Sequence, residues 1–385
     1  SDRPYVFVKI ETNEGVVGWG EATLEGKAGA VIATISDLQE FLLGQNPMPV
    51  EHHWQSIYVH SFYRAGPILG SALSGIDQAL WDLKGKVAGL PLVELLGGKF
   101  RDRVRIYTHF SMADPESAAS MVKRLVGEGY KALKSGVKSR RDDIMDPYVR
   151  DREWGGTVDL YLAAREAAGP DIELLVDCHG RFTVSEAIAL SRALEPADMF
   201  CFEDPVPPDD LKAYPKVKRE TTIPVMGSER LNTKSQFRQL LELDGIDIAQ
   251  PDLIYAGGIT EVKKIAAIAD TYHVPISFHN TKGPIGILAA AHLGAGGRRR
   301  AVRLWDSLLR LDGITTPRRA STGGLRVGAG AGQGVAGQAL GVSRGVTEPS
   351  WRRLCAYAAR AGGGGRRQGE SAERGEKGET PEQTE

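Results

Sequence analysis

The stretch LLVDCHGRF, Leu174 to Phe182, runs from apolar residues directly into an acid, a thiol, an imidazole, a glycine and an arginine. A short apolar run of this kind is typical of a strand that is buried on both faces. Successive side chains of a strand point to opposite faces, so we expect Asp177 and His179 to share one face and Cys178 to point the other way. Cys178 is therefore predicted to be a buried apolar residue and not a metal ligand.

Similar apolar segments alternate with amphipathic helical segments from about residue 105 onwards. They read RVRIYTHF, YKALKSG, MFCFEDP, IPVMGSE, IDIAQPD and VPISFH. Repeated strand-helix units predict a parallel sheet that is covered by helices.

Polar residues end five of these strands at similar intervals of 26, 26, 23 and 27 residues: Asp177, Glu203, Glu229, Asp252 and His279. Similar steps predict equivalent places on successive strands. In a (β/α)8 barrel the carboxyl ends of the strands meet at one mouth, where the chemistry of such barrels takes place. An open doubly wound sheet would instead spread the same groups along an edge. We therefore predict an α/β fold with a (β/α)8-type, TIM-like barrel over residues 105–295.

Residues 1–104 have a different pattern and are predicted to form an α+β capping domain. The segment YVFVKIETNEGVVGWGEAT, residues 5–23, alternates apolar and polar residues around Asn13-Glu14-Gly15, which predicts a hairpin. From about residue 28 to 98 the apolar residues recur at helical spacing, and Gly89-Leu90-Pro91 predicts the end of one helix.

The segment 296–385 departs from both patterns. Arginine is abundant, lysine is almost absent, glycine is over-represented, and no strand-helix alternation continues. Three interpretations compete: a disordered tail, a basic arm that binds nucleic acid, and translation of a GC-rich gene in a shifted reading frame, which we favour. The GxGxxG pattern at Gly332, Gly334 and Gly337 follows no predicted strand, so we interpret it as low complexity.

The composition limits the classes of protein and partner. The chain has 385 residues, of which 42% are hydrophobic and 25% charged, which is typical of a soluble globular protein. A net charge of −1 gives no basic field to attract nucleic acid or an anionic membrane, so we expect small-molecule partners. Three widely spaced cysteines, Cys178, Cys201 and Cys355, indicate a reducing cytoplasm and not a disulfide framework.

Features of a membrane or secreted protein are also missing from the sequence. No apolar run approaches the ~20 residues of a membrane span. The N-terminal SDRPYVFVKI lacks the pattern of a signal peptide and an initiator methionine, so we expect the chain to begin inside the natural one.

The strand-end residues predict a metal site and a base. Three carboxylates on neighbouring strands, Asp177, Glu203 and Glu229, would repel each other unless a cation lay between them, and oxygen ligands suit Mg²⁺. A solvated loop position is the alternative for each acid alone, and their matched spacing disfavours it. Asp252 beside His279 would fix the imidazole tautomer and raise its basicity, which prepares a general base.

Several motifs together resemble the mandelate racemase subgroup of the enolase superfamily, and within it the acid-sugar dehydratases of the galactonate type. They are VDCHG, FEDP, GSER, QPDLIYAGGITE and FHNTKGP in the predicted barrel, and FVKIETNEGVVGWGEATLEG and FYRAGPILGSALSGIDQALWDLKGK in the predicted capping domain. The resemblance covers residues 5 to 294. It implies a homo-oligomer, because members of the family often form symmetric assemblies.

The resemblance implies a role for each site residue. Asp177, Glu203 and Glu229 would bind Mg²⁺, and His279 with Asp252 would be the base. His279 would remove the C2 proton of an acid sugar and His179 would protonate the departing C3 hydroxyl, which gives a 2-keto-3-deoxy sugar acid.

The resemblance also implies that Lys134 binds substrate. The galactonate enzymes have His-Cys where this chain has His279-Asn280, so the pocket beside the base differs, and we expect Asn280 to bind substrate there. Gly136 occupies the place of a second lysine that racemases carry, which favours elimination over racemisation.

The family's eighth strand carries a glutamate that the segment after residue 296 does not show. The capping loops 24–28 and 62–65 are expected to cover the mouth.

Two other functional classes stay open. One is a chain that binds the metal weakly and has no activity, because its altered C-terminus leaves the barrel open. The other is a metal-dependent hydrolase on the same barrel, which requires several histidine ligands. The sequence offers few for that role.

Overall fold

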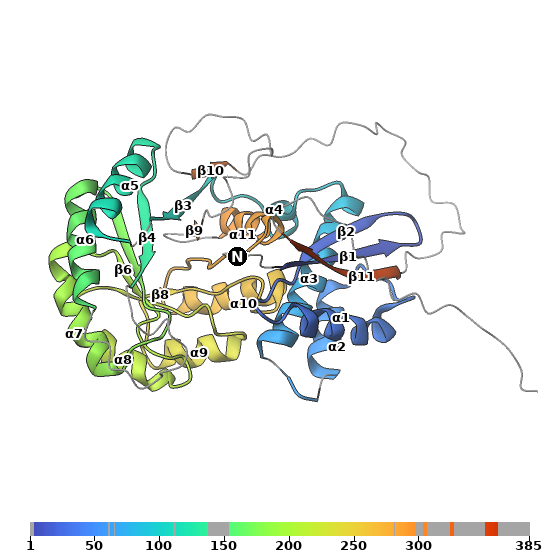
Figure 1. The fold of residues 1–385 in the computed structure, drawn as a ribbon. Helices are drawn as coiled ribbons and strands as arrows, with labels where there is room; N and C mark the ends of the chain where they lie inside the picture. The colour runs from blue at the N-terminus through green and yellow to red at the C-terminus, as the bar shows by residue number, and fades with distance from the viewer. Residues whose placement is uncertain are drawn as a thin grey trace, which may run out of the picture.

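The computed structural model describes residues 4–60, 62–64, 66–110, 113–137, 154–280, 282–297, 303–305, 324–326 and 351–360. Figure 1 shows two parts, a curled parallel sheet with helices on its outer face and a smaller sheet with helices packed beside it. None of the helices in these ranges combines the length and the apolar character that a membrane span requires.

The N-terminal part contains β1 (Pro4–Thr12), β2 (Val17–Glu21), α1 (Ala28–Leu42), α2 (Val50–His60), α3 (Pro67–Ala88) and α4 (Leu92–Leu95). The predicted hairpin is confirmed, because β1 and β2 pair antiparallel. Helix α3 packs directly on β2 because β2 carries glycines there. A Cβ atom on Gly20 would lie 1.9 Å from the carbonyl oxygen of Gly75. Gly18 and Gly20, which have no Cβ atom, thus allow α3 to lie close to the strand that ends at Glu21.

The second part alternates strands and helices, as predicted. Its elements are β3 (Arg103–His109), α5 (Pro115–Gly127), β4 (Ala132–Gly136), α6 (Gly155–Ala168), β5 (Glu173–Asp177), α7 (Val184–Leu194), β6 (Cys201–Glu203), α8 (Tyr214–Lys218), β7 (Val225–Gly227), α9 (Lys234–Glu242), β8 (Ile248–Ala249), α10 (Gly258–Thr271) and α11 (Pro284–Gly296), with the 3-10 helices η2 (Glu195–Ala197) and η3 (Leu211–Ala213). Side-chain caps at Asp114, Thr183 and Thr233 begin α5, α7 and α9.

The strands β3 to β8 are parallel neighbours in chain order. Single parallel bridges continue this order from β8 to the segment 276–279. The sheet is curled, and helices α5 to α9 cover its outer face (Figure 1). The predicted TIM-like α/β fold with an N-terminal α+β unit is confirmed.

The interior of the curled sheet is built in layers. Six buried side chains form an apolar layer: Tyr107, Ala132, Leu175, Cys201, Met226 and Ile248. Side chains two residues further along a strand lie on the same face. Lys134, Asp177 and Glu203 therefore stand above Ala132, Leu175 and Cys201. Cys178 is fully buried in the core outside the sheet, as predicted.

The C-terminal segment contains three strands, whereas the sequence predicts no strand-helix alternation after residue 296. Strand β9 (Arg303–Trp305) pairs parallel with β3, and β10 (Gly324–Arg326) pairs antiparallel with β3. Strand β11 (Trp351–Arg360) pairs antiparallel with β1 along its length. The alternation rule missed these strands because their hydrogen-bond partners lie hundreds of residues away. The predictions of a shifted reading frame and of disorder concern mainly residues outside the described ranges and stay predictions.

Two buried carboxylates of the N-terminal part bind the first turns of two barrel helices. Oδ2 of Asp77 accepts the backbone N–H of Thr260 in α10 at 3.0 Å, and Oδ1 accepts its hydroxyl at 2.5 Å. Glu21 accepts the N–H groups of Gly283 and Gly286 at the start of α11, at 2.5 and 3.1 Å. Negative charge is favourable at a helix N-terminus, where backbone N–H groups lack partners within the helix. The N-terminal part is therefore attached to the barrel next to the strand ends.

Candidate active site

Three predicted metal ligands lie together at the carboxyl ends of β5, β6 and β7. Carboxylate oxygens of Asp177, Glu203 and Glu229 all lie within 4.8 Å of one another. Asp177 and Glu203 are the last residues of their strands, and Glu229 follows β7 by two residues. Glu203 is fully buried, and its Oε2 has no hydrogen-bond partner in the described part of the chain. This donor set, with a buried oxygen available, fits a hard divalent cation.

Lys134 lies against this acidic cluster. It is 1% exposed, its Nζ is 2.8 Å from Oδ2 of Asp177, and it also forms an ion pair with Glu203. Burial opposes its charge, but the carboxylates of Asp177 and Glu203 raise the pKa of Lys134 well above its usual value. A single ammonium group balances only part of the negative charge of the cluster.

The shortage of positive charge is reflected in the pKa values of the carboxyl groups. Burial and the charge of Asp177 raise the pKa of Glu203 to about 8. Burial also acts against ionisation of Glu229, but His279 lowers its pKa to about 2. A bound cation would favour the ionised form of Glu203.

His279 and Asp252 form the predicted pair. Nδ1 of His279 lies 2.7 Å from Oδ2 of Asp252, and Nε2 of His279 lies 2.5 Å from Oε2 of Glu229. Burial lowers the pKa of His279, but Glu229 and Asp252 outweigh burial and raise it to about 10. Asp252 also accepts the N–H of Ile254 at 2.6 Å, which holds its carboxylate in place. The imidazole therefore presents Nε2 to the space occupied by the acidic cluster.

His179 reaches the same cluster, although not by strand alternation. Strand β5 ends at Asp177, and His179 adopts a φ of 51° in the left-handed region. Its N–H donates to Oδ1 of Asp177 at 3.0 Å, and its Nε2 lies 3.2 Å from Oδ2. The hydrogen bond to Asp177 raises the pKa of His179. The side chain is 47% exposed, so it can contact a molecule that enters from solvent.

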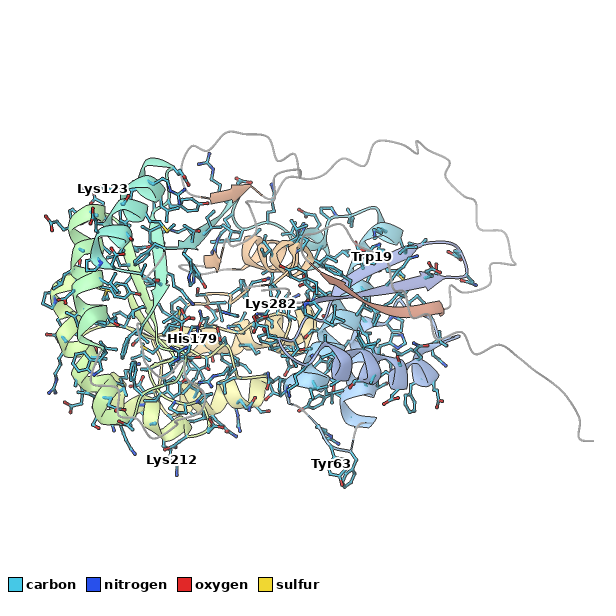
Figure 2. The ribbon with its side chains drawn as sticks, in the orientation of Figure 1. Trp19, Tyr63, Lys123, His179, Lys212 and Lys282 are labelled. Atoms are coloured by element: carbon cyan, nitrogen blue, oxygen red, sulfur yellow. The ribbon has the colours of Figure 1, made fainter. Side chains whose placement is uncertain are left out.

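Asn280 and Lys282 follow His279 at the edge of the site. Asn280 is fully buried, its Oδ1 accepts the N–H of Lys282 at 3.1 Å, and its Nδ2 has no partner among the described residues. Lys282 is 3% exposed and its Nζ lies 2.5 Å from Oε1 of Glu25. Figure 2 shows His179 and Lys282 between the barrel helices and the N-terminal part.

The sequence reasoning missed several polar residues of this region. His109 ends β3, next to the cluster, and burial and Lys134 lower its pKa to about 3. Asp204 is 1% exposed, and burial and the charge of Glu229 raise its pKa to about 7. Lys282 and Glu21 were not assigned either. All four lie in strand or capping motifs of the sequence, so position in such a motif was the available signal.

The expected roof over the mouth is only partly present. Glu25, in the loop 24–28, contacts Lys282. Phe62 and Tyr63 are each 88% exposed, and Figure 2 shows Tyr63 projecting away from His179. Residues 62–64 therefore do not cover the site, and residue 65 of the predicted loop lies outside the described residues.

Comparison with known families identifies the family of this chain. A family model described as "Enolase C-terminal domain-like" matches residues 116–338, and one described as "Mandelate racemase / muconate lactonizing enzyme, N-terminal domain" matches residues 1–97. This chain belongs to the mandelate racemase/muconate lactonizing enzyme family. The resemblance predicted from the strand-end motifs is confirmed. The C-terminal match continues past residue 296, where the sequence pattern changes.

Individual members of the family are also similar to this chain. The D-galactonate dehydratase of Cronobacter sakazakii is 40% identical over 289 residues, which are 75% of each chain. The 3,6-anhydro-D-galactonate cycloisomerase of Zobellia galactanivorans is 34% identical with a TM-score of 0.69, over 79% of this chain and 86% of that one. An enolase of Agrobacterium radiobacter, solved with sodium and L-malate bound, is 31% identical with a TM-score of 0.73, over 80% and 78% of the two chains.

Proposed function

We propose that this chain is a Mg²⁺-dependent dehydratase of an acid sugar similar to galactonate. It would remove the C2 proton and eliminate the C3 hydroxyl as water, which gives a 2-keto-3-deoxy sugar acid. The observation that carries the proposal is the position of His279 Nε2, 2.5 Å from a carboxylate of a three-carboxylate cluster that His179 also contacts. The 40% identity to a D-galactonate dehydratase supports the substrate class.

Asp177, Glu203 and Glu229 would hold the Mg²⁺ ion. When bound, the ion would act as a Lewis acid that offsets negative charge on the substrate carboxylate. The enolase relative solved with sodium and L-malate supports binding of a cation and a small hydroxy acid in this family.

The proton transfers would be carried out by two histidines of this chain. Asp252 accepts the Nδ1 hydrogen of His279. With the charge of Glu229 offset by a bound cation, the pKa of His279 would fall, and the Nε2 lone pair of the neutral imidazole would take the C2 proton. His179, whose contact with Asp177 favours its protonated form, would donate a proton to the C3 hydroxyl as it leaves. The resulting enol becomes the 2-keto product, and the balance of the reaction is loss of one water molecule.

Lys134 and Asn280 would bind the substrate. The Lys134 ammonium group lies beside the acidic cluster and can attract the substrate carboxylate. The Nδ2 group of Asn280, buried and without a hydrogen-bond partner in the described residues, can donate to a substrate hydroxyl. An unsatisfied buried donor is costly, so a ligand that accepts its hydrogen bond gains affinity.

The setting proposed for this reaction is the cytoplasm, with a small acid sugar as the ligand and a symmetric homo-oligomer as the assembly. Cys178 and Cys201 are buried and are not joined to each other by a disulfide bond, which agrees with a reducing compartment. Light scattering after size-exclusion chromatography tests the assembly.

A panel of acid sugars, assayed with and without Mg²⁺ for 2-keto-3-deoxy products, tests the activity. We expect product from at least one galactonate-like acid, and only with the metal. No product from any acid sugar, while Mg²⁺ raises the melting temperature, would favour the metal-binding chain without activity. A cyclised or epimerised product would favour another reaction of the same family, such as the one named for the Zobellia galactanivorans relative.

A further inference from the structure

Asp204 is a buried carboxylate that the proposed reaction does not use. It follows the proposed metal ligand Glu203, at the end of β6, and is 1% exposed. Its Oδ1 accepts the hydroxyl of Tyr214 at 2.9 Å, and its Oδ2 accepts the hydroxyl of Ser228 at 2.9 Å. Ser228 immediately precedes a second proposed ligand, Glu229. One hydrogen bond therefore connects the neighbours of two ligands on different strands.

The backbone of Asp204 connects the same strand ends. Its N–H donates to the carbonyl of Met226 in β7 at 2.9 Å, and its carbonyl accepts the N–H of Gly180, after β5, at 2.6 Å. Its φ of 40° lies in the left-handed region, which residues with a Cβ rarely adopt. Such a conformation persists only where the surrounding contacts hold it. The contacts that hold Asp204 join the ends of all three strands that carry the acidic cluster.

We propose that Asp204, through Ser228 and Tyr214, is a positioning residue that sets the separation of Glu203 and Glu229 for binding a divalent cation. The proposal rests on the proposed function, in which these residues hold Mg²⁺. Mg²⁺ requires near-ideal octahedral geometry, so a small displacement of a ligand lowers affinity. Partners that orient metal ligands commonly change affinity by about 10- to 100-fold when removed.

Calorimetric titration of the full chain with Mg²⁺ tests the proposal. Asp204→Asn keeps the shape and removes the charge, and we expect a loss of affinity of about tenfold or more. Tyr214→Phe removes only the hydroxyl, and we expect a smaller loss in the same direction. Thr260→Val is the matched control, because its hydroxyl also donates to a buried carboxylate, Oδ1 of Asp77 at 2.5 Å, which attaches the N-terminal part and is not in the acidic cluster. We expect the control to melt at a lower temperature and to keep its Mg²⁺ affinity.

Two results would overturn the proposal. One is unchanged Mg²⁺ affinity in folded Asp204→Asn and Tyr214→Phe. That result would mean that the hydrogen bonds of Asp204 contribute to the stability of the fold and not to metal binding. The other is an equal loss of affinity in Thr260→Val, which would mean that affinity falls with general destabilisation. If Asp204→Asn does not fold, Tyr214→Phe decides between these results. A wild-type chain that binds no Mg²⁺ would overturn the proposed function, and this inference with it.

Discussion

Nδ1 of His279 lies 2.7 Å from Oδ2 of Asp252, and a parallel bridge joins the backbones of the two residues. The two residues end neighbouring strands of the curled sheet. Asp252 holds the imidazole by one nitrogen, and the other nitrogen faces the carboxylates of β5, β6 and β7. His179 reaches the same carboxylates from the turn after β5. The two histidines thus approach one site from different strands and can act on different atoms of a substrate.

Replacing each histidine by asparagine should interrupt a different half of the proposed reaction. His179→Asn should still exchange the C2 proton of an acid sugar with deuterated water and should form no dehydrated product. His279→Asn should do neither, because it lacks the base. Proton NMR of the substrate and a product assay measure both steps. Exchange that survives in both variants would identify another base, and Lys134 would be the first residue to test. Near-normal turnover by His179→Asn would mean that His179 is not the acid.

Removing one charge from the acidic cluster should weaken metal binding. Glu203→Gln keeps the side-chain shape and replaces one carboxylate oxygen by an amide nitrogen, so we expect Mg²⁺ affinity to fall at least tenfold. Calorimetry measures the change. Glu242→Gln, on the exposed surface of α9, is the control and should bind Mg²⁺ as the wild type does. Equal affinities for Glu203→Gln and the wild type would remove Glu203 from the proposed ligand set.

Glu21 should stabilise the start of α11. Glu21→Gln leaves one of two backbone N–H groups, those of Gly283 and Gly286, without a good acceptor. We expect the free energy of unfolding to fall by about 1–3 kcal/mol, with faster amide exchange in the first turn of α11. Glu51→Gln is the control, because Glu51 pairs with Lys264 at the surface, where a pair contributes at most about 1 kcal/mol. Equal losses in both variants would contradict a special role for Glu21.

Asp77 should make stability depend on pH. Burial raises the pKa of Asp77 from its usual value of 3.8 to about 7, so the folded state holds a proton that the unfolded state has released between these two values. The contribution of Asp77 is therefore present at low pH and lost as the pH rises towards 7, by about 1.4 kcal/mol per pH unit. Denaturant unfolding at pH 5, 6 and 7 should show a flatter profile for Asp77→Asn than for the wild type. Parallel profiles would mean that the pKa of Asp77 is not raised.

Strand β11 should be protected from hydrogen exchange. Its residues, Trp351–Arg360, pair with β1 along nearly its whole length. We expect their amides to exchange at rates similar to those of β1, as hydrogen-exchange mass spectrometry can measure. Exchange as fast as in an unfolded peptide would mean that β1 is an edge strand in solution. It would support the interpretation of the segment 296–385 as a disordered tail or as the product of a shifted reading frame.

The parallel sheet and the grouping of the acids could be predicted from the sequence, because both depend on local patterns. Apolar strands that end in acids predict where each side chain faces, since alternation along a strand is a property of the backbone. Similar intervals place Asp177, Glu203 and Glu229 at equivalent strand ends, and the structure brings their carboxylates together. The pairing of Asp252 with His279 followed from the same reasoning.

The contacts that join distant segments could not be predicted from local patterns, because they depend on how the folded chain is packed. Lys134 pairs with Asp177 and Glu203 because three strands lie side by side, and Glu21 binds the start of α11 across more than 250 residues. The position of His179 depends on a left-handed turn that strand alternation does not predict. Strand β11 has no pattern of its own that identifies it, and its hydrogen bonds come from the free edge of β1. Local patterns fix which way a side chain faces, whereas its partner depends on how the whole chain is packed.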